Sequence, residues 1–238
     1  HPNYVPNIDE QIAMIKEVSI ESVQSFYDDF YGVSNKASLV AIGSMDVNMV
    51  KNYFEDNFSD FKSDKPFSEI DNPFKKNIAA NENIITPDKN NAFTVGMLSA
   101  KITETGKDNA ALQIAGTIFG GGFLNSRVAT RLRQQDGVSY GAGAQVSIDS
   151  DPDDKNSALI IYAIYAPMNA EKVQIGFKEE IERFIEDGIT QKELDSAING
   201  WVQGQAVSRA KDNELSSLIN NNLYFERDMA FYAALESQ

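Results

Sequence analysis

The sequence Val-Ser-Tyr-Gly-Ala-Gly-Ala-Gln-Val-Ser-Ile occupies residues 138–148. Its apolar residues stand at alternate positions, from Val138 through Tyr140 to Ile148. A period of two residues predicts a half-buried strand with small side chains on its packed face. A polar turn over 149–156 and a second apolar run over 158–166 follow, and together they indicate paired strands.

Helical patterns flank this strand pair on both sides. Downstream, a stripe from Val173 to Ile185 ends at Gly188, and a capping box of Thr190 and Glu193 opens the next helix. The other expected elements are strands near 82–87 and 92–100 and helices over 108–119, 125–135 and 213–224. The predicted fold class is α+β, with helices layered on a mostly antiparallel sheet.

The first third of the chain has its own pattern. Ser19 caps a helix whose apolar stripe we expect to be buried, residues 37–43 indicate a buried strand, and Asp46 caps another helix. Pro66 and Pro73 then mark an extended segment. We therefore expect three parts. They are a helix-strand-helix unit over 1–65, a linker over 66–80 and a main α+β domain over 81–238.

The composition excludes several kinds of site. The net charge is −14, which disfavours nucleic acid as a partner; the acidity serves solubility or attracts basic peptides. Cysteine is absent and the single histidine is His1. A catalytic zinc or a serine triad needs interior imidazoles or thiolates, so we expect no metal site and no cofactor in this chain. No apolar run reaches the roughly 18 residues of a membrane-spanning helix.

Three short patterns have simpler explanations than catalysis. The run Gly120, Gly121, Gly122 follows a helix and lacks the Gly-Lys-Ser ending of a phosphate loop, so it indicates a turn between helices. The adjacent pair Glu179 and Glu180 lies on the polar side of a helix. The acidic stretch 149–154 lacks the glycine and final glutamate of a calcium loop and favours a solvated turn.

Three arginines lie close together in the sequence of an otherwise acidic chain, and this clustering requires an explanation. They are Arg127, Arg131 and Arg133. If a turn at Gly137 joins the helix to the strand, Arg133 and Tyr140 could face one cleft. Both are strong hydrogen-bond donors suited to a peptide carbonyl or carboxylate. The alternative is an arginine–tyrosine contact that only fixes the junction.

The chain resembles the pitrilysin/insulinase-type zinc peptidases over nearly its whole length. The resemblance is carried by the glycine-rich turn and Ser-Arg pair of 120–127 and by Arg-x-x-x-Gly-x-x-Tyr within 132–140. Flanking stretches over 30–46 and 187–194 also match. In that family two similar halves close around a peptide-sized chamber, and one half carries an inverted zinc motif that is absent here.

The resemblance implies a role and a set of partners. The chain would be a segment of the non-zinc half, with its C-terminal end truncated, inactive alone and paired with a zinc-bearing half. Arg133 and Tyr140 would reach across the chamber to the peptide substrate, and Gly120, Gly121 and Gly122 would line it. Residues 1–65 would be the closing helix-strand-helix of the structural unit that precedes the main domain. Exchange of these residues between two copies of the chain would give a homodimer.

Two rival functions stay open. One is a catalytically inactive family member that serves as a structural or partner-binding subunit. The other is an unrelated peptide-binding module. Absence of cysteine and the resemblance together favour a bacterial periplasm or cell envelope, with the cytoplasm as the alternative.

Overall fold

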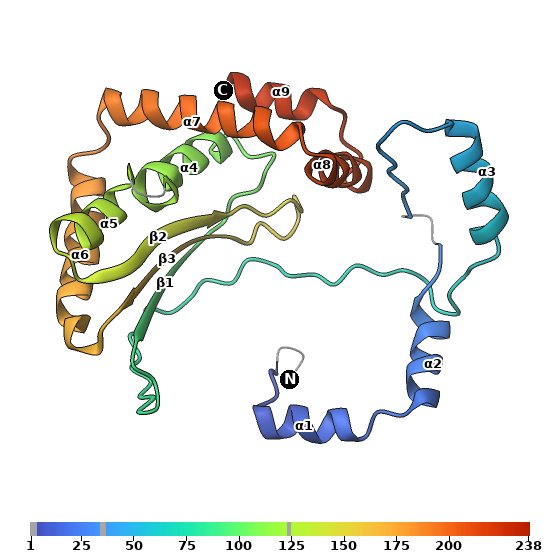
Figure 1. Ribbon diagram of the computed structural model, residues 1–238, viewed down its shortest axis with the longest axis horizontal. Coiled ribbons are helices and arrows are strands. Elements are labelled where there is room, and N and C mark those ends of the chain that lie inside the picture. The colour runs from blue at the N-terminus through green and yellow to red at the C-terminus, as the bar shows by residue number, and fades with distance from the viewer. Residues whose placement is uncertain (1–3, 34–36, 123–124) are drawn as a thin grey trace. The chain divides into compact units, whose positions relative to one another are not determined.

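The computed structural model describes residues 4–33, 37–122 and 125–238 (Figure 1). His1 and two residues of the glycine-rich motif, Phe123 and Leu124, lie outside the described residues. The chain divides into two compact units, residues 1–70 with 216–224 and residues 71–215 with 225–238. Each unit is described by itself.

The larger unit is built on an antiparallel sheet. Its strands are β1 (Ala92–Ala100), β2 (Ser139–Ser147) and β3 (Ser157–Tyr165), in the order β1-β3-β2. Around them lie α4 (Asn109–Gly116), the π-helices η1 (Thr117–Gly121) and η3 (Thr130–Gln135), α5 (Arg127–Ala129), the 3-10 turn η4 (Pro167–Asn169), α6 (Ala170–Glu186), α7 (Gln191–Arg209) and α9 (Ala230–Ser237). The fold class is the predicted α+β arrangement.

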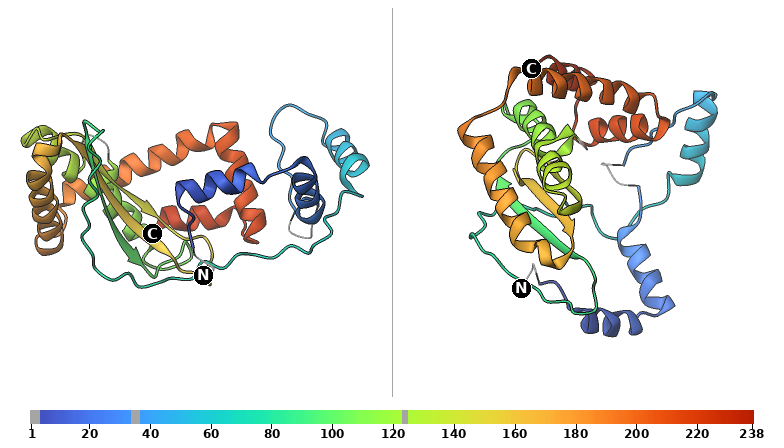
Figure 2. Two further views of the ribbon diagram at one scale, coloured as in Figure 1. Left: turned by 90° about the horizontal axis from the view of Figure 1, so that it is seen from below. Right: turned by 60° about the vertical axis from the view of Figure 1, so that its left-hand side comes forward.

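Helices cover one face of the sheet (Figure 2). The core joins Phe119, Leu132 and Phe177 from the helices to Ala163 and Tyr165 of β3. Leu132 is fully buried, as are Val128 and Val173. The other face carries Phe93, Val95 and Met97 of β1, which are exposed.

Several sequence signals act as expected. Ser19 accepts a hydrogen bond from the amide of Ser22 and begins α2, and Thr190 and Glu193 form the predicted capping box of α7. Gly188 has a φ of +68°, which side chains rarely tolerate, and it follows the last turn of α6. Helix α9 has no counterpart among the expected elements. None of the helices in the described residues is both long and apolar enough to cross a membrane.

Arg227 fixes the start of α9. Its guanidinium, largely buried, donates to the Glu104 carboxylate at 2.5 Å and to the Ser150 carbonyl at 2.6 Å. The rings of Phe225 and Phe231 lie 4.7 and 4.5 Å from it. One cation therefore ties the end of the chain to two loops at the same end of the sheet.

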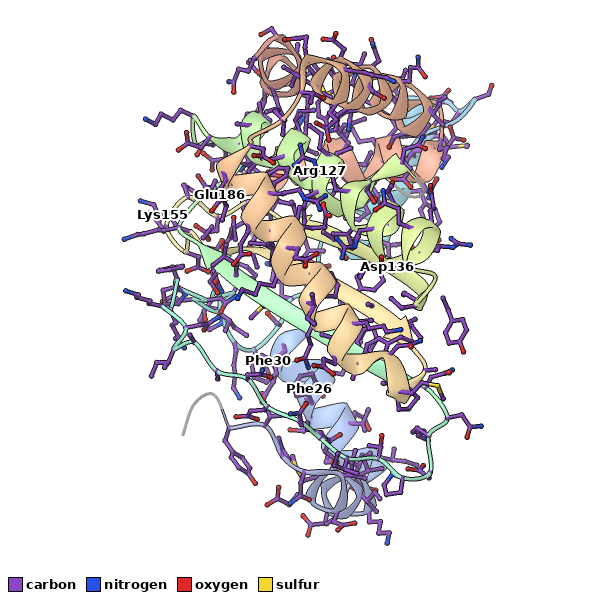
Figure 3. The ribbon with its side chains drawn as sticks, turned by 90° about the vertical axis from the view of Figure 1, so that its left-hand side faces the viewer. Phe26, Phe30, Arg127, Asp136, Lys155 and Glu186 are labelled. Atoms are coloured by element: carbon purple, nitrogen blue, oxygen red, sulfur yellow. The ribbon has the colours of Figure 1, made fainter. Side chains whose placement is uncertain are left out.

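The smaller unit holds α1 (Ile8–Lys16), α2 (Ile20–Phe30), α3 (Val47–Phe58) and most of α8 (Asp212–Tyr224). Phe26 and Phe30 are neighbours on α2, with ring centroids 4.8 Å apart (Figure 3). Lys65 bonds the Asp29 carboxylate at 2.6 Å and lies over the Phe30 ring. The segment after α3 thus returns alongside the end of α2.

Two kinds of expectation from the sequence are wrong. Residues 37–43 and 82–87 form no strand, because no described strand pairs with them, and an unpaired strand leaves its backbone groups unsatisfied. The stripe of α2, expected to be buried, is exposed, and none of the residues of α1, α2 or α3 is buried. Amphipathic periodicity identified the helices correctly but not their burial.

Candidate functional site

The candidate site lies where η3 turns into β2. Leu132 is fully buried and its carbonyl accepts the amide of Val138 at 3.0 Å, which closes the helix onto the strand. Gly137 supplies the turn with a φ of +64°. The predicted helix–turn–strand junction is therefore confirmed. Arg133 lies in η3 before this junction and Tyr140 in β2 after it.

Arg127 is tied into the protein. Its guanidinium donates to both carboxylate oxygens of Glu193, at 2.7 and 2.9 Å, and to the Gly188 carbonyl at 2.7 Å. It also lies 5.1 Å from the centre of the Phe184 ring. A bidentate pair with a further carbonyl bond uses most of its donors, so Arg127 joins α5 to the start of α7.

Arg131 is tied in the same way. It donates to the Asp136 carboxylate at 2.8 Å and pairs with Glu179 at 2.7 Å, with Glu180 farther away at 3.9 Å. Arg131 thereby joins the end of η3, which Asp136 caps, to α6. Like Arg127, this side chain has a structural explanation.

Arg133 differs from both. It is exposed, and no hydrogen bond, ion pair or ring contact joins it to the residues that the structure describes. An unpaired guanidinium keeps all five of its N–H donors available. Of the three arginines, Arg133 alone is therefore free to bind a ligand.

Tyr140 is turned outward by an irregularity in β2. Ser139 lies opposite Tyr165 and Gly141 opposite Ile164, so Tyr140 is the extra residue of a β-bulge. Alternation from Val138 places Tyr140 on the packed face. Instead Ser139 is buried and Tyr140 is 65% exposed. The expectation that Tyr140 belongs to the packed face is wrong, because the bulge shifts the alternation by one residue.

The three glycines differ in their surroundings. A Cβ on Gly120 would lie 2.2 Å from the amide nitrogen of Ala144, so η1 and β2 approach each other as closely as a glycine allows. Gly121 lines a cavity beside β2, and Gly122 lines another beside α7. Close packing therefore explains the glycine at 120. A Cβ on Gly122 would lie 3.0 Å from the Thr117 carbonyl oxygen, a tight contact, whereas a Cβ on Gly121 would make ordinary contacts.

The residues present do not fit a metal. No group of three His, Cys, Asp or Glu side chains within residues 4–33, 37–122 and 125–238 is arranged to hold an ion. In the acidic turn, the Asp149 carboxylate accepts the amides of Asp151 and Asn156, at 2.9 and 2.8 Å. Asp151 in turn accepts the amide of Asp153. These carboxylates shape the turn, as the solvated-turn interpretation predicts.

The pair between Arg127 and Glu193 makes stability depend on pH. Hydrogen bonding to Arg127, with a further bond from Thr190, lowers the pKa of Glu193 to about 2. Since an unfolded glutamate titrates near 4.3, the pair stabilises the protein fully above that pH and is lost as the pH falls toward 2. After allowance for partial exposure the effect is about 1–2 kcal/mol.

We expect Glu193→Gln to lower the free energy of unfolding by this amount at pH 6. Urea unfolding of both proteins should show the difference shrinking toward zero by pH 2, and glutamine keeps the capping box. Glu182→Gln, whose partner Lys178 is 3.8 Å away at an exposed site, is the matched control. A difference that persists unchanged to pH 2 would contradict the assignment.

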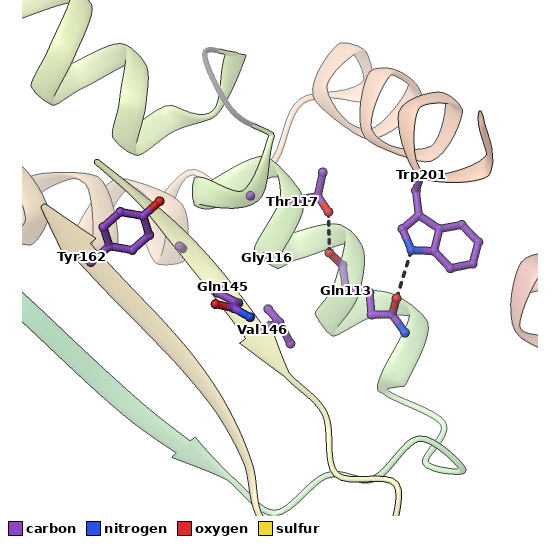
Figure 4. A pocket seen from close by; sticks show the side chains of 9 residues that line it. Gln113, Gly116, Thr117, Gln145, Val146, Tyr162 and Trp201 are labelled. Carbon is purple, nitrogen blue, oxygen red and sulfur yellow. Dashed lines mark hydrogen bonds between the residues drawn. The ribbon is translucent and has the colours of Figure 1, made fainter. Parts of the chain in front are cut away.

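One feature gave no signal in the sequence. Gln113 of α4, Gln145 of β2 and Trp201 of α7 line the cavity beside β2 (Figure 4). Trp201 and Gln113 are both half-buried, and Gln113 is a polar residue next to the apolar stripe of 108–119. Neither position marks a cavity in the sequence.

Comparison with known proteins agrees with the fold. A family model described as the peptidase M16 inactive domain matches residues 17–200. A peptidase M16 inactive domain from Pseudomonas fluorescens superposes with a TM-score of 0.74 at 16% identity, covering 94% of this chain and 52% of that one. A protease from Helicobacter pylori gives 0.71 at 16%, covering 95% and 54%.

The periplasmic protease PqqL from Escherichia coli gives a TM-score of 0.55 at 16% identity, covering 82% of this chain and 21% of that one. No curated protein sequence matches. The chain spans about half the length of the first two structures. Likeness at such identities shows the fold alone. The family match covers most of the chain, and this chain therefore belongs to the peptidase M16 family through its inactive domain.

Proposed function

We propose that this chain is the non-catalytic half of a zinc metallopeptidase and contacts the peptide substrate through Arg133 and Tyr140. The contrast among the three arginines carries the proposal. Arg127 and Arg131 each pair with carboxylates of the protein, whereas Arg133 is exposed and has no partner within the part of the chain that the structure describes. Tyr140 likewise has no hydrogen-bond partner among the described residues, and a bulge turns it out of the core.

The two side chains suit a peptide backbone. A guanidinium donates strong hydrogen bonds to a carbonyl oxygen and strengthens them as negative charge develops on that oxygen. The tyrosine hydroxyl adds a neutral donor. Zinc would be held by the partner half, where it would activate water; among the described residues of this chain no cluster is arranged to ligate it.

The partner half also gives a reason for the exposed apolar side chains of α2. Val23, Phe26 and Phe30 form a stripe that no described element buries. Such a stripe needs a partner surface, and we assign it to the zinc-bearing half. If residues 1–65 are instead exchanged between two copies of the chain, the second copy covers the stripe and light scattering will show a dimer of the chain alone. Phe26 will then not become buried when the zinc-bearing half is added.

A bacterial cell-envelope location belongs to the same proposal. It is supported by the absence of cysteine and by likeness in fold to a periplasmic protease. The rival function, an inactive subunit with a structural role, predicts that no side chain at the site affects hydrolysis. The proposal and the rival are therefore separated by substitutions that leave the fold intact.

Tyr140→Phe removes one hydroxyl and keeps the ring. In the enzyme assembled with its zinc-bearing half, we expect kcat/KM to fall about tenfold, the worth of one neutral hydrogen bond in the transition state. Tyr53→Phe, which changes an exposed tyrosine of α3 outside the sheet, is the matched control. Equal activities for both variants would remove Tyr140 from the site.

A further inference from the structure

The β-bulge at the start of β2 decides which way Tyr140 points. Opposite two consecutive residues of β3, Tyr165 and Ile164, β2 supplies the three residues from Ser139 to Gly141. Ser139 is buried and Tyr140 is exposed. A bulge of this kind bends the strand and aims a side chain away from its regular direction. The outward direction of Tyr140 therefore depends on whatever keeps the bulge in place.

Glycine does not hold this bulge. One common type of bulge rests on a glycine in the left-handed region of φ. Gly137 has a φ of +64°, but it belongs to the turn before β2, and none of residues 139–141 has a positive φ. A Cβ on Gly141 would meet nothing within 4 Å, so close packing does not require a glycine there either. A side chain is therefore the better candidate for the support of the bulge.

The Ser139 hydroxyl bridges the two strands at this point. Its oxygen lies 2.9 Å from the Gly141 carbonyl oxygen, on β2, and 2.9 Å from the Ile164 carbonyl oxygen, on β3. Ser139 is only 8% exposed, so water is largely kept away from these bonds. A bulge disrupts the ladder locally, and buried backbone carbonyls then need another donor. The hydroxyl supplies that donor to both strands.

We propose that Ser139 is a positioning residue whose hydroxyl holds the bulge and thereby turns Tyr140 out of the core. Without the hydroxyl, two carbonyls lose a buried donor, and a regular register that restores the ladder competes with the bulge. A shift of register by one residue moves a side chain to the other face of the sheet. The inference rests on the proposed substrate contact of Tyr140 and extends it to a residue that touches no substrate.

The first test needs neither zinc nor the partner half. Tetranitromethane nitrates accessible tyrosine rings, and mass spectrometry of the digested chain gives the rate at each tyrosine. Tyr53, an exposed tyrosine of α3, is the internal reference. We expect Ser139→Ala to slow nitration of Tyr140 about threefold or more relative to Tyr53, because a lost buried donor shifts such an equilibrium roughly ten- to a hundredfold. An unchanged ratio of the two rates in the folded variant would overturn the proposal.

Ser157→Ala is the matched control. Ser157 is a fully buried serine at the far end of β3, and its hydroxyl donates to the Ile102 carbonyl at 2.7 Å. Its replacement should cost stability without slowing the nitration of Tyr140. Equal slowing by the two alanine variants would reflect a general loosening of the sheet and would contradict a specific role of Ser139.

A pair of variants of equal size covers the case in which Ser139→Ala does not fold. Ser139→Thr keeps the hydroxyl and Ser139→Val replaces it by a methyl group of similar volume. We expect nitration of Tyr140 to be about threefold or more faster in the threonine variant than in the valine variant. Equal rates in these two variants would assign the effect to packing and would sink the proposal.

A double-mutant cycle in the enzyme assembled with its zinc-bearing half tests the link to catalysis. Ser139→Ala should lower kcat/KM about fivefold or more in the parent, but less than about twofold when Tyr140 is already phenylalanine. Ser157→Ala should have the same effect in both backgrounds. An undiminished effect of Ser139→Ala in the Tyr140→Phe background would overturn the proposal. If Tyr140→Phe leaves hydrolysis unchanged while Ser139→Ala slows nitration, the proposed substrate contact fails and the positioning of Tyr140 stands.

Discussion

If Arg133 contacts the substrate as proposed, we expect Arg133→Ala to lower kcat/KM by about 100-fold in the enzyme assembled with its zinc-bearing half. The reason is the loss of a charged hydrogen-bond donor to the peptide carbonyl as negative charge develops on it, an interaction worth about 1.5–3 kcal/mol. The measurement is the steady-state hydrolysis of one peptide over a range of concentrations. A fall in kcat, and not only a rise in KM, assigns the effect to the transition state.

The same substitution, Arg133→Ala, should leave the stability of the folded chain nearly unchanged. Arg133 has no partner among the described residues, so its removal should change the free energy of unfolding by less than about 0.5 kcal/mol. Arg183→Ala is the matched control, because Arg183 is half exposed and its guanidinium pairs, among the described residues, with Glu180 alone at 3.0 Å. If both variants lose the same activity, the loss reflects the acidic protein's charge and not a substrate contact.

We expect Gly120→Ala to lower the free energy of unfolding of the larger unit by about 3 kcal/mol or more. The added Cβ would meet the Ala144 nitrogen at 2.2 Å and the Ala144 Cβ at 2.3 Å. These atoms belong to β2, which is fixed by its pairing with β3, so the helix cannot shift without disturbing the core. Thermal unfolding should occur about 10 °C lower than in the parent chain.

Gly204→Ala separates close packing from helix propensity. Nothing lies within 4 Å of a Cβ at Gly204, which is in the interior of α7. There alanine should stabilise the protein by about 0.5–1 kcal/mol, the ordinary preference of a helix for alanine over glycine. If Gly120→Ala leaves the free energy of unfolding unchanged, η1 can shift to accept the added Cβ. That result would favour a role of Gly120 in binding over a role in packing.

Local signals predicted the helices well because they act within a few residues. The Thr190–Glu193 capping box and the stop at Gly188 need only backbone amides one turn away. The hairpin of β2 and β3 was likewise predictable from alternation. By contrast, the strand expected at 37–43 depends on a distant partner, and the expected burial of the α2 stripe depends on what covers it.

The site was predictable only in part. Spacing identified Arg133 and Tyr140, but alternation assigned Tyr140 to the packed face, since a bulge adds one residue without a sequence signature. The distinction among the arginines was also hidden. Arg127 finds Glu193 sixty-six residues away, a partner that only the packing of α5 against the start of α7 brings near.

The most direct test of the account is peptide hydrolysis in the presence of added zinc. The chain is assayed alone, then mixed with a zinc-bearing half of the same family. The account predicts no cleavage by the chain alone and cleavage on mixing that a chelator abolishes, with Arg133→Ala strongly impaired. Cleavage by the repurified chain alone, abolished by chelation, would contradict the conclusion that this domain is non-catalytic.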